Sequence, residues 1–162
     1  SFPTRRSSDL TLSPVSLLSV LDSVFESFSS SYPGITIDTS GFTDCAVMAD
    51  RKQLSQGFYN LFKNAVDEMK EQGTIILSNS LVTKGNLRYC RIQLQDTGAG
   101  IPEADWDQVF NPYFTTKPKG TGLGLPIVER IVFDHKGYIW FETEAGVGTT
   151  FFIDLPAAEM KL

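Results

Sequence analysis

The sequence has few of the residues on which several common functions depend. Its 162 residues include two cysteines and one histidine, and the net charge at pH 7 is −5, with 19 acidic and 14 basic side chains. This deficit of positive charge argues against nucleic acid as a partner. Cys45 and Cys90 lie in apolar, strand-like runs, so we expect reduced core thiols rather than a disulfide or a metal pair.

Long apolar runs are also absent. No stretch approaches the roughly 18 residues that a membrane-spanning helix needs, and no signal-peptide pattern is present. The length suits a single domain with a sizeable core. We expect residues 13–157 to form a soluble domain. The polar segment 1–12, with Arg5 and Arg6, is expected to be a disordered tail or a non-native segment, and 158–162 a C-terminal tail.

The order of apolar patterns predicts an α+β protein. Helical spacing predicts helices from Ser13, as the cap, to about Ser30, and from Asp50 to about Gln72. Further elements are a helix over 125–133, a short helix over 102–110, a hairpin turn at 85–86, and strands near 35–37, 45–48, 74–77, 88–95, 138–143 and 149–155. This order favours a two-layer sandwich, with three main helices on one face of a mixed, mostly antiparallel sheet of about five strands.

Two asparagines and an aspartate share one face of the second predicted helix. Asn60 and Asn64 are four residues apart, and Asp67 follows three residues later. Amide and carboxylate oxygens suit Mg²⁺, a hard cation that bridges phosphates. The alternative is that they are ordinary exposed polar groups. Because asparagine is a poor helix former, two of them in mid-helix favour a function.

Glycines accompany two further candidate binding elements. Asp96 ends a strand predicted to be buried and is followed by Gly98 and Gly100. Its carboxylate could accept a hydrogen bond from an adenine amine, or could simply close a turn. Three glycines in Gly120–Gly124 precede an apolar helix, and a glycine-rich helix start presents free N–H groups to a phosphate. A plain glycine turn would give the same pattern.

Five motifs together resemble the ATP-binding domain of sensor histidine kinases, over about residues 14–156. In order, they are Asn60-Leu-Phe-Lys-Asn64-Ala65, Asp96-Thr-Gly98-Ala-Gly100, Phe110-Asn-Pro-Tyr-Phe114, Gly120-Thr-Gly122-Leu-Gly124 and Gly146-Val-Gly148-Thr149. The resemblance implies the Bergerat ATP-binding fold, which is shared with gyrase B, the heat-shock 90 chaperones and the MutL proteins. The run from Phe114 to Gly120 is most similar to the nitrogen-regulatory sensor kinases.

The resemblance also implies a role for each matching residue. Asn64 is expected to hold Mg²⁺ with Asn60 beside it, and Asp96 to read the adenine amine with support from Thr149. Lys117 is expected to face the terminal phosphates; the alternative is an ordinary solvated lysine. Together with Asn60 and Asn64, Lys117 forms the expected catalytic set. The remaining expected ATP-binding residues are Asp67, Gly98, Gly100, Ile101, Phe114, Thr116, Gly120, Thr121, Gly122, Leu123 and Gly124. Phe110 and Phe114 are expected to dock a mobile lid over 111–119, or to belong to the core.

The implied activity is that of a protein-histidine kinase that uses Mg-ATP. The resemblance implies a cytoplasmic domain, belonging either to a soluble or to a membrane-anchored kinase. In this family the phosphoacceptor histidine lies in a separate dimerisation domain, and a response regulator acts downstream. We therefore expect a monomeric fragment of a homodimeric kinase, with His135 structural. Asn60 stands where ATPase relatives carry a glutamate and cannot take a proton, which predicts slow hydrolysis. The alternatives are a hydrolytic ATPase, a nucleotide-responsive module without turnover, and a serine kinase of the anti-sigma-factor type.

Overall fold

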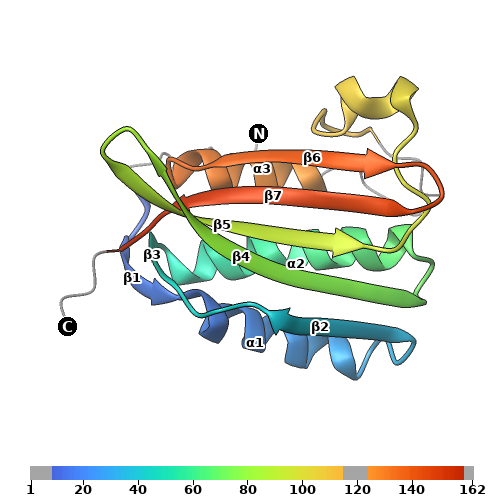
Figure 1. Ribbon diagram of the computed structural model, residues 1–162, viewed down its shortest axis with the longest axis horizontal. Coiled ribbons are helices and arrows are strands. Elements are labelled where there is room, and N and C mark those ends of the chain that lie inside the picture. The colour runs from blue at the N-terminus through green and yellow to red at the C-terminus, as the bar shows by residue number, and fades with distance from the viewer. Residues whose placement is uncertain (1–8, 115–123, 159–162) are drawn as a thin grey trace.

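A five-stranded sheet with helices on one face forms the body of the protein in a computed structural model, which describes residues 9–114 and 124–158 (Figure 1). The strands follow the order β2-β4-β5-β7-β6. Their bounds are β2 Ile35–Gly41, β4 Gly73–Lys84, β5 Leu87–Asp96, β6 Tyr138–Glu144 and β7 Gly148–Pro156. Within this sheet, β2 and β4 pair in parallel, and the remaining pairs are antiparallel. The predicted α+β sandwich is confirmed.

Three α-helices cover one face of this sheet, namely α1 Leu17–Ser29, α2 Arg51–Glu68 and α3 Gly124–Asp134 (Figure 1). Their apolar stripes meet the inward side chains of the strands, because successive strand residues point to opposite faces. On β5, for example, Cys90, Ile92 and Leu94 are all buried. No helix in the described part of the chain is both long enough and apolar enough to cross a membrane.

The first helix begins later than the sequence pattern predicts. Ser13–Ser16 form a strand, β1, that pairs antiparallel with β3, Ala46–Ala49. Val15 is buried by this pairing, and the cap of α1 is Ser16, whose side chain accepts a hydrogen bond from the Ser19 backbone N–H. The helix start predicted at Ser13 is therefore wrong. The partner strand, which outcompetes the local helix signal, lies some thirty residues away along the chain.

The second helix is correctly capped but ends early. Asp50 accepts a hydrogen bond from the Gln53 backbone N–H at 3.2 Å, as an N-cap does. The helix ends at Glu68 rather than near Gln72, because Lys70 and Glu71 adopt left-handed backbone conformations with φ of 54° and 63°. Gly73, which the sequence pattern predicts to end this helix, is instead the first residue of strand β4.

The elements that carry the candidate site converge at one end of the sheet. β5 ends there, β7 begins there, and a short 3-10 helix, η2 (Glu103–Gln108), follows β5 (Figure 1). The hairpin turn predicted at Gly85-Asn86 is confirmed at the opposite end, where Lys84 pairs with Leu87. Strand β5 thus runs from an exposed turn to the candidate site, so its last residue, Asp96, is held by a long strand with neighbours on both sides.

Candidate functional site

Asp96 is a buried carboxylate held by backbone groups from two parts of the chain. Its side chain is 1% exposed. Oδ1 accepts hydrogen bonds from the backbone N–H of Gly98 at 2.9 Å and from that of Thr149 at 3.2 Å. Two N–H donors compensate a carboxylate for lost hydration and orient it. The structure therefore brings Asp96 and Thr149 together, as the sequence predicts for these two residues.

A pair of threonine hydroxyls extends this cluster. Thr149 is buried, and its Oγ1 lies 2.9 Å from Oγ1 of Thr143 on β6. The Thr143 hydroxyl also accepts a hydrogen bond from the Ile101 backbone N–H at 2.8 Å. It thereby connects the turn after Asp96 to the β6–β7 hairpin. Thr143 lies outside the sequence motifs, although its place in an alternating strand, two residues after inward-facing Phe141, could have indicated it.

Three glycines of the sequence motifs, two of which are also predicted site residues, have packing reasons of their own. A Cβ on Gly98 would lie 2.9 Å from the carbonyl oxygen of Glu68, at the end of α2. Gly100 has a φ of 85°, and a Cβ there would lie 2.7 Å from the Glu144 carbonyl oxygen. A Cβ on Gly148 would collide with the backbone carbonyl of Asp96. The absence of these side chains lets the segments around Asp96 touch directly, whatever further role the glycines have towards a ligand.

The asparagine face of α2 lies in the same layer as α3. Asn60, Asn64 and Asp67 are each half-buried, and their spacing places them on one face of the helix. Asp67 forms an ion pair of 2.7 Å with Lys63. The hydrogen bond to Asp67 raises the pKa of Lys63 above its ordinary value. Lys63 thus offsets the charge of Asp67 on the helix face that also carries the two asparagine amides.

The aromatic residues that follow η2 divide between core and surface. Phe110 packs against Phe141 and Phe151, with ring centroids 6.2 and 6.4 Å apart. Phe114 is half-buried, and its backbone N–H donates to Asn111. Ile101 is partly buried against the core. Phe110 thus anchors the segment after η2 to the sheet, which agrees with either of its two predicted roles.

Comparison with known proteins assigns the chain to a family. The profile of the family described as histidine kinase-, DNA gyrase B-, and HSP90-like ATPase matches residues 49–159. The chain belongs to this ATPase family. Sporulation kinase C of Bacillus subtilis is 38% identical over 112 residues, which are 69% of this chain and 25% of that protein. The chain therefore spans about a quarter of this curated relative.

Solved structures agree with this assignment. The catalytic domain of histidine kinase ThkA has a TM-score of 0.77 and 30% identity, covering 91% of this chain and 96% of that one. Full-length ShkA in complex with AMPPNP has a TM-score of 0.80 and 29% identity, covering 94% of this chain and 32% of that one. As a member of the ATPase family, this chain is an ATP-binding domain.

Part of the family's motif set falls outside the described residues. The expected contacts at Thr116, Lys117, Gly120, Thr121, Gly122 and Leu123 lie there and stay predictions. Gly124 is described as the first residue of α3, and no described atom lies within 4 Å of a Cβ placed on it.

His135 joins the two helices of this ATPase domain that carry site motifs. It is 2% exposed and follows α3. Its Nε2 accepts the backbone N–H of Asp50, the cap of α2, at 3.1 Å, so Nδ1 carries the proton and donates to Ile131 O at 2.7 Å. The structural role predicted for His135 agrees with these bonds. The ring thus bridges the end of α3 and the start of α2 through both of its nitrogens.

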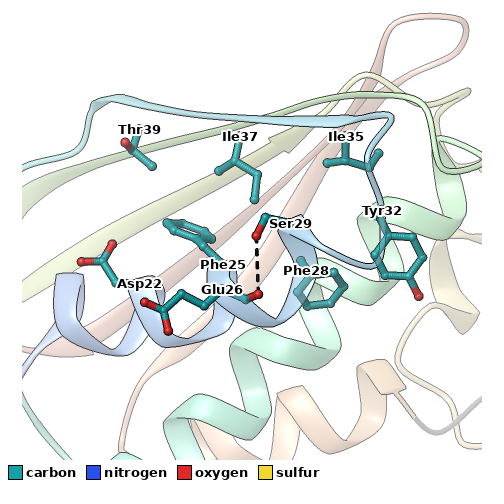
Figure 2. A pocket seen from close by; sticks show the side chains of 9 residues that line it. All are labelled: Asp22, Phe25, Glu26, Phe28, Ser29, Tyr32, Ile35, Ile37 and Thr39. Atoms are coloured by element: carbon teal, nitrogen blue, oxygen red, sulfur yellow. Dashed lines mark hydrogen bonds between the residues drawn. The ribbon is translucent and has the colours of Figure 1, made fainter.

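A groove of about 450 Å³ lies elsewhere, between α1 and β2. Figure 2 shows Phe25, Ile35 and Ile37 in its walls, with the carboxylates of Asp22 and Glu26 along one side. Carboxylates there would repel phosphate. The groove contains none of the residues predicted to bind ATP, so the cluster around Asp96 remains the candidate nucleotide site.

Proposed function

We propose that this chain is the catalytic domain of a sensor histidine kinase, which binds Mg-ATP and transfers the γ-phosphate to a histidine on a separate domain. The observation that carries the proposal is the Asp96 carboxylate, buried at the end of β5 and oriented by the N–H groups of Gly98 and Thr149. A carboxylate fixed in this way suits the exocyclic amine of adenine, because the ion accepts hydrogen bonds and donates none.

The phosphate side of the proposed site comes from α2 and the beginning of α3. Asn64, with Asn60 one turn earlier, would hold Mg²⁺ through amide oxygens, which suit a hard cation that keeps several waters. Bound with ATP, the ion would offset phosphate charge. Phosphoryl transfer requires positioning and charge neutralisation more than covalent participation by the protein. In this proposal the asparagines of α2 would help to position the phosphates, and no described side chain has to act as a nucleophile.

The acceptor belongs to another domain in this proposal. His135 is the single histidine of the chain, and it is buried with both ring nitrogens hydrogen-bonded. Asn60 cannot act as a general base at neutral pH, so ATP should persist until an acceptor arrives. We expect a dimerisation domain of the same kinase to present the histidine, with a response regulator downstream.

Calorimetric titration tests the nucleotide site. ATP with Mg²⁺ should bind the wild type, and Asp96→Asn should abolish binding, because an amide can turn a donor towards the adenine amine. Asn64→Ala should weaken the dependence of affinity on magnesium. Asp107→Asn, an exposed aspartate of η2, is the matched control and should bind as the wild type does. Equal affinities for wild type and Asp96→Asn would contradict the proposed site.

Phosphotransfer to a histidine-bearing helical domain, supplied in trans with radiolabelled ATP, tests the activity. Label should reach that domain and should be lost in Asn64→Ala. Acid-labile, base-stable product would indicate phosphohistidine, whereas acid-stable label on serine would favour the serine-kinase alternative. Release of inorganic phosphate without any acceptor would favour a hydrolytic ATPase. Binding with no turnover under any condition would favour a nucleotide-responsive module.

A further inference from the structure

Met69, which follows α2 directly, contacts the residue after Asp96. It is 6% exposed and serves as the C-cap of α2. Its sulfur lies 3.4 Å from the backbone nitrogen of Thr97 and 3.3 Å from the Thr97 hydroxyl oxygen. A thioether sulfur is a weak acceptor and has no hydrogen to donate. Both interactions are therefore donated by Thr97 to one side chain of the helix end.

The Thr97 hydroxyl is fixed from a second direction. Its Oγ1 accepts a hydrogen bond from the backbone N–H of Thr74, at the start of β4, at 3.1 Å. A hydroxyl has a single hydrogen, and the contact with sulfur directs that hydrogen towards Met69. Side chain and backbone of Thr97 are thus both oriented by the same helix end.

The contact between Met69 and Thr97 is also tightly packed, which restricts the turn from Asp96 to Gly98. A Cβ on Gly73 would lie 2.6 Å from Thr97 Oγ1 and 2.7 Å from Met69 Sδ. Real Cβ atoms essentially never come that close, so the gap between β4 and this contact is filled. On the other side of the turn, Gly98 lies against the Glu68 carbonyl so closely that a Cβ would be 2.9 Å away. The end of α2 therefore packs on the turn from two directions.

The consequence for Asp96 follows from the chain itself. Thr97 lies between Asp96 and Gly98, whose N–H donates to Asp96 Oδ1. A rotation of the Thr97 backbone would move that N–H away from the carboxylate. We propose that Met69 is a positioning residue for nucleotide recognition, whose sulfur fixes Thr97 and thereby aims the Asp96 carboxylate at the exocyclic amine of the base. This inference rests on the proposed nucleotide site.

The arrangement also couples the two halves of that site. Met69 is five residues from Asn64 and is bonded to the same helix, its N–H donating to Ala65 O at 3.0 Å. A shift of α2 along its axis would carry the sulfur away from Thr97. The contact of Met69 with Thr97 thus links the adenine side of the site to the helix that carries the metal side, and a variant at Met69 should affect the side that recognises the base.

The affinities for two different nucleotides measure how well Asp96 is positioned. ADP carries the amine that Asp96 would read, and IDP carries a carbonyl oxygen in its place. Calorimetry gives the dissociation constant of each, and their ratio reports how well the carboxylate is aimed. Met69→Leu keeps an apolar side chain of similar volume but removes the acceptor. We expect the preference for ADP over IDP to fall by about 3- to 10-fold, the range for one modest hydrogen bond.

Matched variants separate positioning from stability. Thr97→Val, which removes the hydroxyl, should lower the preference in the same direction, and Thr97→Ser, which retains it, should restore it. Combined with Met69→Leu, Thr97→Val should add less than its separate effect. Met48→Leu on β3 is a methionine control away from the turn and should leave the preference unchanged. Melting temperatures of all variants show that each is folded.

The outcomes distinguish the two proposals. If the wild type prefers ADP and Met69→Leu lowers only the melting temperature, with the preference for ADP intact, Met69 is a packing residue and the inference is wrong. If the wild type binds ADP and IDP equally, the assignment of Asp96 to the base fails. If the wild type binds neither nucleotide, the proposed function itself fails.

Discussion

Asp154 offers a test of what holds the sheet together, independent of any ligand. It lies on β7 and is fully buried. Its neighbours Ile153 and Leu155 face the helices, so Asp154 faces the other side of the sheet, which the three helices do not cover. Arg91 covers it with two hydrogen bonds, Nε to Oδ1 at 2.8 Å and Nη2 to Oδ2 at 3.0 Å. Lys84 adds an ion pair of 2.8 Å to Oδ2. We predict that Asp154→Asn destabilises the protein without changing nucleotide affinity.

The magnitude follows from the exposure of the partners. Breaking a fully buried ion pair typically costs 3–5 kcal/mol. Here the side chains of Lys84 and Arg91 remain 39% and 28% exposed, so they can regain water, and the asparagine keeps one acceptor. We therefore expect a loss of about 2–3 kcal/mol in the free energy of unfolding. For a chain of this size, that corresponds to a fall in Tm of about 4–12 °C.

The pH dependence gives a second measurement. Burial alone would raise the pKa of Asp154, but hydrogen bonds from Arg91 and Lys84 outweigh it and hold the pKa below its ordinary value of 3.8. A lowered carboxyl pKa contributes stability above the unfolded-state value, and that contribution disappears as pH falls through the folded-state value. The stability gap between wild type and Asp154→Asn should thus be constant from pH 5 to 8 and shrink below about pH 4.

Urea unfolding at several pH values, followed by circular dichroism, is the appropriate assay. Asp134→Asn serves as control, because Asp134 lies 4.0 Å from Arg130, whose side chain is 46% exposed, and a long pair to such a partner should contribute little. A change below about 0.5 kcal/mol in Asp154→Asn, the size of an ordinary surface substitution, would refute the reasoning. So would a stability gap that widens on acidification.

Three further predictions concern the site. His135→Phe should lower the free energy of unfolding by about 1–3 kcal/mol in thermal melts, because the Asp50 N–H loses its acceptor; His135→Gln, which retains an acceptor, should lose less. Asn60→Glu should increase phosphate release in a colorimetric ATPase assay, since a carboxylate can activate water; an unchanged rate would show that this position does not face the γ-phosphate. Gly148→Ala should destabilise the protein by more than about 1 kcal/mol and weaken ADP binding. The reason is that the φ of 147° at Gly148 disfavours a side chain and that a Cβ would collide with the Asp96 carbonyl. Unimpaired ADP binding in calorimetry would contradict the connection between Gly148 and the Asp96 site.

The sequence predicted those features that short stretches encode. Asp50 was predicted as a helix cap and Gly85-Asn86 as a hairpin turn, because capping and turn preferences are local. Pairing of Asp96 with Thr149, 53 residues apart, came from the ordered motifs and their resemblance to a family rather than from any local preference. Of the two cysteines expected in the core, Cys90 is buried and Cys45 is half-buried.

The remaining features depend on contacts that a single sequence does not display. Strand β1 forms because Ser13–Ser16 pair with Ala46–Ala49, and no local sequence pattern specifies that partner. The early end of α2 depends on Lys70 and Glu71, non-glycine residues in a left-handed conformation that residue type does not predict. Met69 would be taken from sequence as one more apolar residue of a helical stripe. Its contact with Thr97 becomes visible only when the helix end and the strand end are placed together.

The contact between Asp96 and Thr149 has a kinetic consequence. These residues belong to β5 and β7, and the chain between the two strands contains η2, α3 and β6. Contacts that close long loops tend to form late in folding. The candidate nucleotide site would then be absent from the folding transition state and present only in the finished protein. A nucleotide that binds there should slow unfolding and leave the refolding rate unchanged, so its protection would take the form of a longer lifetime of the native state.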